Sequence, residues 1–570
     1  MNAARFIEKQ SASGRPQFGH FASGHLLVPD HINRSRIDVG TAPNVNGNSN
    51  KEKRIVLIKP PLYTCSTFSP IRSAQPLGIW QLGSFLSSRG FEVRVVDSVI
   101  EGWGNKRRIG SSELFDFPSH MKEKWAYLRT HSPREFLATY PVVDGSGGIR
   151  RSIIRTGLSD EQIVERVREF DPAWIGISII ATCEHRGAME LAKRLRSEFP
   201  ESKILAGGSH ATDMARLVMD DSGGAIDFIV KGAGELATEL LMRGVLSERG
   251  IAYKDGNRII EEADSPPTPL EILPPLDPGL LSHVNYPILA PHSYGTHGRK
   301  YTDYMFSFGC HKGCDFCRQG SVRDGYRHLS LEQVRAQLRI FRDHGIEELV
   351  LQDDSLLGGP RNDGKEFFLQ VVRLLKESGI FWHDNGGVEF ERLDERIVDS
   401  ILESNCSPGD SRCTALYVPF NPRHLDQRRV VEHHMAKRPD QLALLRKLRE
   451  NGIYTFTSGI WGHVNQDAAD MESDIQGYEE LLKSGIVDQV IVFGLSYLPR
   501  TRDWDFRHLI ADPYDWEGFS IFTPHAGTMN ATLDEVNLMV LEAYKRLNPL
   551  QMHAEPWASG IPPNVPEGWR

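Results

Sequence analysis

Short apolar runs alternate with amphipathic segments over two stretches of the chain, residues 54–263 and 300–508. In the first stretch, proline, glycine or charged residues bound the apolar runs, as in buried parallel strands, and the segments between them have the 3.6-residue period of helices. Strands are expected at 54–61, 91–97, 174–178, 203–208 and 228–232. Helices are expected at 77–86, 160–170, 184–198 and 235–246. This alternation predicts an α/β fold with a doubly wound, Rossmann-like parallel sheet, which binds ligands at the carboxyl ends of its strands.

The second stretch repeats the alternation with six strand candidates. They lie at 304–308, 348–352, 381–385, 414–418, 454–457 and 489–493. Helices of clear periodicity lie between them, for example at 330–345 and 439–452. Six βα units predict a partial (β/α)6 barrel of the TIM type, with its active site at the C-terminal mouth.

Composition changes mark the other parts of the chain. Residues 1–53 are rich in Ser, Gly, Asn and His and have no sustained period, which predicts a disordered N-terminal extension. A charged and aromatic insertion at 100–156 interrupts the first stretch. Residues 264–299 begin with closely spaced prolines and read as a linker. Residues 509–570 form a C-terminal segment with one expected helix near 533–547.

The overall composition is that of an ordinary globular protein. The 570 residues are 40% hydrophobic and 25% charged, enough for two or three domains that each bury a core. A net charge of −9 argues against a nucleic-acid partner. No apolar run approaches the ~20 residues that span a bilayer, so no membrane partner is expected. The N-terminus lacks the layout of a secretory signal, and seven scattered cysteines do not suggest a disulfide framework. We therefore expect a cytoplasmic protein, and a monomer, since no coiled-coil pattern is present.

Three of the seven cysteines fall within eight residues, in the run Cys310-His-Lys-Gly-Cys314-Asp-Phe-Cys317. A structural zinc site takes four ligands, commonly as two cysteine pairs, and no second pair with a two-residue gap exists. Iron–sulfur clusters are held by such close thiolate runs. Three thiolates on a four-iron cube leave one iron open to another ligand, so we interpret the run as a [4Fe-4S] site. The alternatives are a zinc site completed by Cys406 or Cys413, or three unligated thiols.

The cysteine spacing resembles the signature of the radical S-adenosylmethionine (SAM) enzymes, in which SAM binds the open iron. Phe316, just before the last cysteine, fits that pattern and is expected at the SAM site. The resemblance implies that polar groups at the end of the second barrel strand, Gln352, Asp353 and Asp354, hold the SAM amino group, which a carboxylate would pair. The alternative for the two aspartates is a helix cap before Ser355. The resemblance places further SAM contacts after later strands, at Glu389, Ser458, Gly459 and Gly462.

Small and polar residues end the strands of the first stretch. Taken alone, the glycines among these residues also fit tight turns without a ligand. Their order is a proline-ended first strand, a Pro-Leu-Gly helix start, the segment 206–212 (Ala-Gly-Gly-Ser-His-Ala-Thr) and the segment 232–235 (Gly-Ala-Gly-Glu). This order resembles the cobalamin-binding domain that precedes the barrel in cobalamin-dependent radical SAM enzymes, over about residues 54–501. The cobalamin contacts that the resemblance implies are Pro61, Arg72, Ser178, Gly207, Gly208, His210, Gly232, Gly234 and Glu235.

One part of the chain departs from other cobalamin domains. The Asp-x-His-x-x-Gly motif, whose histidine coordinates cobalt in methionine-synthase-like domains, is absent after the first strand. No protein histidine is therefore expected below the cobalt. Arg72 or Tyr63 either faces the metal or only packs. Cys65 reads as a small buried thiol, and Cys406 and Cys413 read as loop thiols in preference to a redox pair.

The whole pattern resembles the cobalamin-dependent (class B) radical SAM methyltransferases. The resemblance implies three cofactors, namely a [4Fe-4S] cluster, cobalamin and SAM, and an external one-electron reductant of the flavodoxin or ferredoxin type. It also implies that one SAM methylates cobalamin, while a second yields a 5′-deoxyadenosyl radical that activates an inert carbon. The substrate radical then takes the methyl group from methylcobalamin. A small molecule or natural-product precursor is the expected substrate, contacted by Tyr497 and Arg500.

Three other functions fit the same motifs. The first is a radical rearrangement or cyclisation without methyl transfer. The second is polar methylation of a nucleophilic carbon without homolysis of SAM. The third is a corrinoid or iron–sulfur sensor without turnover. A complete barrel with acidic residues at its second strand argues against a sensor, which has no need of a SAM pocket.

Overall fold

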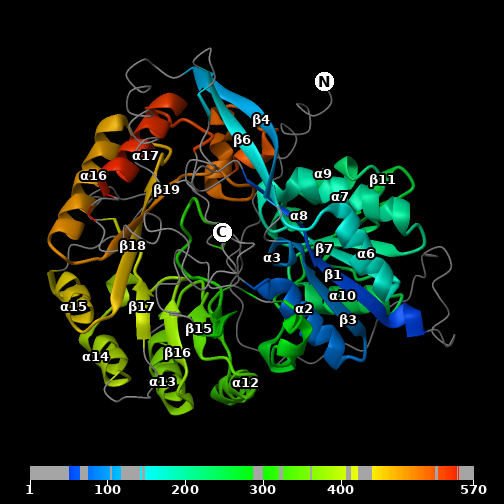
Figure 1. Cartoon of the computed structure of the whole chain (residues 1–570), viewed down its shortest axis with the longest axis horizontal. Coiled ribbons are helices and arrows are strands. Elements are labelled where there is room, and N and C mark those ends of the chain that lie inside the picture. The colour runs from blue at the N-terminus through cyan, green and yellow to red at the C-terminus, as the bar shows by residue number, and fades with distance from the viewer. Residues whose placement is uncertain are drawn as a thin grey trace, which may run out of the picture. The chain divides into compact units, whose positions relative to one another are not determined.

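Two parallel sheets organise the chain (Figure 1). The structure is a computed structural model, and all the residues that it describes belong to one compact unit, Val45–Arg570. They are residues 50–64, 75–102, 106–116, 142–143, 148–284, 286, 299–319, 325–359, 363–405, 413–421, 439–519, 524–547 and 550. The predictions for residues 1–49, Arg72, Cys65 and Cys406 lie outside them. Among the described helices, none is both long and apolar enough to cross a membrane.

The first sheet has seven strands in the order β11-β10-β9-β8-β7-β1-β3. Five of them are parallel, as the sequence predicts, and their apolar residues form the core of this part of the chain. At one edge of the sheet, β10 and β11 form an antiparallel hairpin that the sequence analysis missed, and β10 pairs antiparallel with β9. The strands are β1 (Arg54–Lys59), β3 (Glu92–Asp97), β7 (Trp174–Ser178), β8 (Lys203–Gly207), β9 (Phe228–Val230), β10 (Ile251–Asp255) and β11 (Arg258–Glu261). The helices are α2 (Leu77–Ser88), α3 (Ser98–Glu101), α6 (Asp160–Phe170), α7 (His185–Glu198), α8 (Ser209–Asp213), α9 (Ala215–Asp221) and α10 (Gly234–Met242).

The strand order of this sheet reverses at β1. The chain runs from β1 to β3 on one side and then returns to β7 on the other. In doubly wound sheets, ligands bind outside the carboxyl ends of the strands at such a switch point. The fold therefore directs attention to the residues that follow β1 and β7.

The second sheet has six parallel strands in the sequence order β12-β15-β16-β17-β18-β19, with β12 and β19 at its two edges. Six consecutive βα units confirm the partial TIM-type barrel. The strands are β12 (Tyr301–Tyr304), β15 (Glu348–Leu351), β16 (Phe381–Asp384), β17 (Cys413–Tyr417), β18 (Tyr454–Trp461) and β19 (Gln489–Gly494). The helices are α12 (Leu331–Asp343), α13 (Asp363–Ser378), α14 (Glu395–Glu403), α15 (Pro439–Glu450), α16 (Ala468–Lys483) and α17 (Leu533–Leu547).

The predicted first barrel strand at 304–308 is wrong. The strand β12 ends at Tyr304, and Ser307–Phe308 form a separate strand, β13, which pairs antiparallel with β14 (Arg327–His328). The polar residue Asp303 hid the true strand from a search for apolar runs. It is buried because the backbone N–H of Gln75 donates to its carboxylate over 3.1 Å, while its own N–H donates to the Gln75 side chain over 2.9 Å.

The insertion at 100–156, which the sequence left unassigned, contributes three strands to a small antiparallel sheet, and β2, directly after β1, contributes the fourth. Its order is β2-β6-β4, and β5 also pairs with β6. The strands are β2 (Leu62–Thr64), β4 (Lys106–Asp116), β5 (Val142–Val143) and β6 (Gly148–Thr156). Two register shifts interrupt the pairing of β4 with β6.

The proline-rich segment after residue 264 is tied to helices of both sheets. The Trp80 indole N–H donates to the carbonyl of Asp277 over 2.7 Å, so the segment contacts α2. The side-chain amide of Gln337 on α12 accepts from the N–H of Leu276 over 2.7 Å and donates to its carbonyl over 3.2 Å. These bonds fix a segment whose prolines prevent it from forming a regular element.

Two histidines form a buried chain of hydrogen bonds between α7 and α8. His185 Nδ1 lies 2.9 Å from His210 Nε2, and His185 Nε2 lies 3.0 Å from an Asp221 carboxylate oxygen. The Thr182 hydroxyl lies 3.3 Å from His210 Nδ1, and Trp516 packs on His185 at 4.5 Å between ring centroids. All four ring nitrogens have hydrogen-bond partners when both imidazoles are neutral and carry their proton on Nε2. Burial, helped by the neighbouring His185, lowers the pKa of His210 to about 3, and burial also lowers the pKa of His185.

Acid is expected to destabilise the fold through His210. Because its folded pKa lies below its unfolded value, the unfolded state binds more protons as the pH falls from about 6.5 towards 3, and stability is lost over that window. At pH 5 the loss through one such histidine is about 2 kcal/mol. Thermal unfolding of wild type and His210→Gln between pH 7.5 and 5 should show a smaller acid-induced fall in Tm for the variant, by a few degrees. His344→Gln, at an exposed residue, is the control and should follow wild type. Equal slopes for wild type and His210→Gln would contradict this account.

Candidate functional site

The three clustered cysteines lie on the loop that follows β13. Gly309 and Gly313 adopt left-handed backbone conformations there, with φ of +78° and +76°. A Cβ on Gly309 would lie 2.0 Å from the carbonyl oxygen of Gly325, so only glycine fits at the start of the loop. Within the loop, the N–H of Cys317 donates to the carbonyl of Cys314 over 3.2 Å.

The three thiols share one electrostatic environment. Burial, together with the charges of Cys317 and Cys310, raises the pKa of Cys314 to about 12. Burial likewise raises the pKa of Cys310, and Cys317 contributes to that shift. A bound iron–sulfur cluster, being cationic metal, would hold these thiols as thiolates. Among the described residues, no three Cys, His, Asp or Glu side chains converge on one metal ion. Thiolates on a four-iron cube bind different irons and need no such convergence.

Two carboxylates at the end of β15 hold this loop. Asp353 is fully buried, and one of its oxygens accepts from the N–H of Ser307 over 2.6 Å and from the Ser307 hydroxyl over 2.5 Å. Asp354 accepts from the N–H of Gly309 over 2.9 Å and from the side chain of Gln319 over 2.7 Å. Gly309 precedes the first cysteine and Gln319 follows the last. Asp354 therefore clamps both ends of the cysteine loop.

The helix-cap alternative for these aspartates finds no support. The next described helix, α13, begins only at Asp363. Burial raises the pKa of Asp353 to about 7 and also raises the pKa of Asp354, as expected for carboxyl groups held inside a site. Gln352 donates its side-chain amide to Asp303. The assignment of these three residues to the SAM amino group stays a prediction.

The other predicted SAM residues also have partners within the protein. Glu389 accepts from the Ser355 hydroxyl and from the N–H of Leu357, the latter over 2.9 Å. It is close enough to Cys310 to raise the pKa of that thiol. The Ser458 hydroxyl lies 2.5 Å from the Tyr417 hydroxyl.

The two predicted SAM glycines on and after β18 serve packing in this structure. A Cβ on Gly459 would lie 2.4 Å from the Trp461 ring. Gly462 has φ of +92° and donates its N–H to the Gln466 side chain over 3.0 Å. Phe316, in turn, makes an edge contact with the His463 ring at 5.5 Å between centroids. The positions fit the barrel mouth, and SAM binding by these residues stays a prediction.

A buried ion pair inside the cysteine run escaped the sequence analysis. The Lys312 side chain is only 4% exposed and pairs with Glu391, two residues after Glu389. A buried charge needs such a partner. A lysine between two clustered cysteines was the available signal, but its partner 79 residues away leaves no local trace.

The predicted cobalamin residues mostly end neighbouring strands of the first sheet. Ser178 and Gly207 are paired in register at the ends of β7 and β8, and Pro61 follows β1. Gly208 has φ of +102°, and a Cβ there would lie 2.5 Å from the carbonyl of Ile179. Figure 1 shows β7 beside β1, where the strand order reverses.

The loop after β9 completes this edge. Gly232 has φ of +75°, and a Cβ there would lie 2.5 Å from the carbonyl oxygen of Ser265. Gly234 starts α10, and the Glu235 carboxylate accepts from the Thr268 hydroxyl over 2.7 Å. Only residues without a side chain allow the backbone to come this close.

Two exposed apolar side chains near these loops were also missed. Ile180, just beyond β7, is 49% exposed, and Leu236, at the start of α10, is 41% exposed. Both follow glycine-lined strand ends, where they offer apolar contact surface beside the expected ligand. His210, in contrast, is buried with both ring nitrogens bonded inside the protein, and its contact with cobalamin stays a prediction.

The predicted substrate residues are engaged within the protein. Tyr497 is fully buried and donates its hydroxyl to the carbonyl of Gly527 over 3.0 Å. Arg500 pairs with Asp213 and Asp264. Their contact with a substrate stays a prediction.

Cys413 is not a loop thiol. It is the first residue of β17, is 1% exposed, and directs its thiol to the carbonyl of Ala415 over 3.7 Å. It starts a barrel strand, whereas the clustered cysteines lie beyond the far ends of the strands. The zinc alternative that needed Cys413 therefore lacks its fourth ligand.

Two family models match the chain in this order. The B12 binding domain matches residues 146–242, and the Radical SAM superfamily matches residues 304–476. The first match covers β7, β8 and β9. The second runs from the last residue of β12 into α16 and includes the cysteine run.

Several known proteins resemble the chain. Cytidylyl-2-hydroxyethylphosphonate methyltransferase of Streptomyces wedmorensis is 26% identical over 381 residues, 61% of this chain and 63% of that protein. The chain thus spans less than two thirds of that relative. The structure of TsrM from Kitasatospora setae with cobalamin and a [4Fe-4S] cluster aligns with a TM-score of 0.51 and 15% identity, covering 85% of each chain. The structure of OxsB with aqua-cobalamin aligns with a TM-score of 0.51 and 15% identity, covering 86% of this chain and 61% of OxsB.

At these identities the solved structures support the fold alone. The family models, matched in the order in which the two sheets occur, identify both domains. The chain thus carries a match to a B12 binding domain followed by a match to the Radical SAM superfamily, and its sequence and fold are similar to those of cobalamin-dependent radical SAM enzymes.

Proposed function

We propose that the chain is a cobalamin-dependent radical SAM methyltransferase that moves a methyl group from SAM to an unactivated carbon of a small molecule. The observation that carries the proposal is a clamped loop of three thiols, in a chain that also has a glycine-lined strand edge in its B12-binding domain. The methyltransferase named above supports this reading. When bound, the [4Fe-4S] cluster supplies the electron that cleaves SAM, and cobalamin carries the methyl group.

The residues of the barrel would bind the cluster and SAM and exclude water from them. Cys310, Cys314 and Cys317 would hold three irons and leave the fourth to SAM. Asp354 orients their loop from both ends, and Glu389 holds the loop after β15 close to Cys310. Hydrogen bonds within the protein hold these groups in place, which is the preorganisation that a reactive site needs.

The strand edge of the first sheet would bind the corrinoid. Gly207, Gly208 and Gly232 let a large ring approach the backbone, while Ile180 and Leu236 offer it apolar surface. An oxygen-sensitive cluster requires a reducing compartment, so we place the protein in the cytoplasm with an external one-electron reductant. A monomer is proposed on the sequence evidence alone.

The substrate class is proposed from the named relative. That protein, by its name, acts on a phosphonate joined to a cytidylyl group. A nucleotidylylated phosphonate is therefore the first compound to test, ahead of a wider panel of natural-product precursors.

The products of SAM test the reaction type. Anaerobically reconstituted protein, given hydroxocobalamin, a strong reductant, SAM and the substrate panel, is expected to release both S-adenosylhomocysteine and 5′-deoxyadenosine, measured by liquid chromatography and mass spectrometry. Cys317→Ala should lose the deoxyadenosine. S-Adenosylhomocysteine alone would replace the proposal with polar methylation, and deoxyadenosine alone with rearrangement or cyclisation. Neither product, in protein that holds cluster and cobalamin, would overturn the catalytic claim.

Asp354→Asn tests whether this carboxylate clamps the loop or binds SAM. As a clamp it receives two hydrogen bonds, and hydrogen bonds to a charged group contribute about 1.5–3 kcal/mol each. Iron and sulfide per chain should then fall to less than about half of the wild-type content, because the loop holds its cluster less well. Asp399→Asn, at an exposed helical residue paired with Lys447, should retain it.

A SAM ligand would behave differently. Full iron content in Asp354→Asn, with SAM affinity weakened about tenfold or more by equilibrium binding, would contradict the clamp and support the contact with the SAM ammonium.

A further inference from the structure

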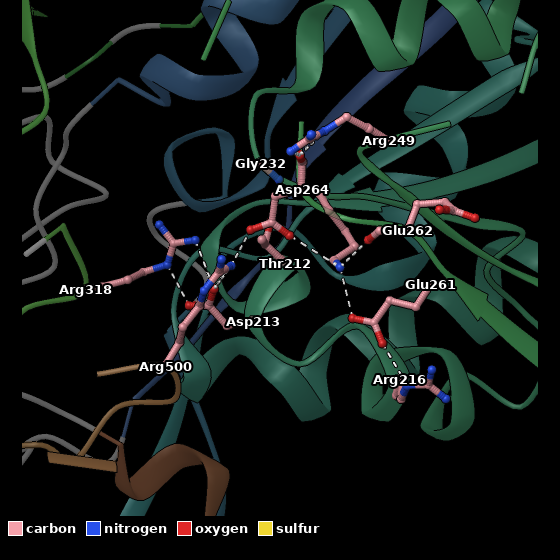
Figure 2. Close-up of polar contacts among 11 residues, drawn as sticks. Thr212, Asp213, Arg216, Gly232, Arg249, Glu261, Glu262, Asp264, Arg318 and Arg500 are labelled. Atoms are coloured by element: carbon pink, nitrogen blue, oxygen red, sulfur yellow. Dashed lines mark hydrogen bonds and ion pairs between the residues drawn. The ribbon is translucent and has the colours of Figure 1, made fainter. Parts of the chain in front are cut away.

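A network of ion pairs links the cysteine loop to the B12-binding sheet, and Asp213 is its centre (Figure 2). Asp213 ends α8, and its side chain is only 4% exposed. Arg318, the residue after Cys317, donates two hydrogen bonds to this carboxylate, over 2.6 and 3.0 Å. Arg500, after β19, donates a third over 3.3 Å. One buried carboxylate thus holds two barrel loops.

A second arm runs from Arg500 back into the first sheet. Arg500 also pairs with Asp264, which lies 3.3 Å from the ammonium group of Lys231. The Lys231 side chain is 7% exposed and pairs with Glu261 over 2.9 Å. Arg216, on α9, pairs with the same glutamate over 2.8 Å. Figure 2 shows these contacts as one continuous chain of charges from Arg318 to Arg216.

The residue beside Asp213 contacts the proposed corrinoid edge. The Thr212 hydroxyl accepts from the N–H of Gly232 over 3.2 Å. Gly232 lies in the loop after β9, where its positive φ and its bridge to Ser265 leave no room for a side chain. Two consecutive residues of α8 therefore hold, respectively, the corrinoid edge and the cysteine loop.

The segment that carries Arg500 is itself constrained. Arg500 adopts φ of +64°, a conformation that residues other than glycine rarely take and that persists only where surrounding contacts hold it. Two residues further on, Arg502 donates to the Asp315 carboxylate over 2.5 Å and to the Asp315 carbonyl over 3.0 Å. The segment thus contacts the cysteine loop directly at Asp315 and indirectly through Asp213.

Burial of Asp213, whose side chain is 4% exposed, makes its contact with the partly buried Arg318 different from a surface ion pair, whereas Arg500 is 41% exposed. A buried, two-pronged contact between arginine and carboxylate is among the stronger polar interactions, whereas exposed pairs contribute little. Without the Asp213 charge, Arg318 would lose both of its bonds to this carboxylate, and Arg500 would keep its pair with Asp264. Loss of the Asp213 charge should therefore affect both arginines at once.

We propose that Asp213 is a positioning residue that fixes the cysteine loop, through Arg318 and Arg500, against the strand-end loops of the B12-binding domain. This inference rests on the proposed function, in which one substrate must meet groups held by both domains. A small displacement between such groups costs a large part of the rate advantage of a preorganised site. Asp213 touches neither cysteine nor substrate in this role and acts only through its two arginines.

Hydrogen exchange on the reconstituted holoprotein tests the junction without turnover. In Asp213→Asn, amide exchange should rise about tenfold or more in peptides covering 306–319 and 496–503, because local opening becomes easier. Arg318→Met should raise it in 306–319, and the double variant should add little, because both changes remove the same contact. Arg500→Gln, which leaves the Asp213–Arg318 contact intact, should act mainly on 496–503. Glu366→Gln, which removes an exposed pair with Arg396, is the matched control.

Turnover gives a second readout. Asp213→Asn should keep its iron and cobalamin content while the amount of deoxyadenosine formed per methylated product rises about threefold or more, since radical formation is no longer matched by methyl transfer. Unchanged exchange in Asp213→Asn, additive effects in the double variant, or equal effects in Glu366→Gln would overturn the inference. A protein that shows the exchange pattern but never transfers a methyl group would instead count against the proposed function.

Discussion

Buried carboxylates that accept hydrogen bonds from loops are the constraint on which the site depends. A carboxylate inside a protein is tolerated only when donors surround it. Asp353 meets this condition with donors from Ser307 on β13, which leads into the cysteine loop. Asp354 meets it with donors from the two ends of that loop, and Asp213 meets it with two arginines. The donors of each loop therefore stabilise the buried carboxylate that holds it. The end of β15 fixes the position of Asp353 and Asp354, and α8 fixes that of Asp213.

In the first sheet, the corresponding constraint is close approach of the backbone, which glycine allows. Its strand ends approach one another so closely that a Cβ at Gly208 or Gly232 would overlap a carbonyl oxygen. Side chains are absent where a large ring is expected, and apolar ones, Ile180 and Leu236, stay open beside it. The barrel thus offers charged acceptors and fixed thiols, while the B12-binding sheet offers bare backbone and apolar surface.

Local patterns predicted the parts of the fold that depend on local physics. Helix α6 was found with both ends correct because Ser159 and Gln162 form a capping box ahead of an amphipathic run. β7 is a short, mostly apolar run that Asp171 and Pro172 precede in the sequence. β12 was misplaced because its buried Asp303 looks like a loop residue until Gln75, 228 positions away, is known to bond it.

In the candidate site, too, only the features that depend on local sequence could be predicted. Close cysteine spacing is a local signal, so the loop was found. Asp213 and Lys312 were missed because their partners lie 105 and 79 positions away, and no spacing rule connects them. Asp354 was selected for its position at a strand end, yet the structure gives it contacts with the loop that the sequence did not suggest.

The bonds between Gln75 and Asp303, and between Gln337 and Leu276, bear on how such chains diversify. The first pair joins the B12-binding domain to the barrel, and the second joins the segment between the two domains to the barrel. Both use buried polar groups that water cannot reach. Exchange of a whole domain with a distant relative would leave these groups without partners, and the hybrid would carry that penalty from the start. New substrate preferences in this architecture should therefore arise by substitution within loops and insertions, and recombination at the domain boundary should be a rare route.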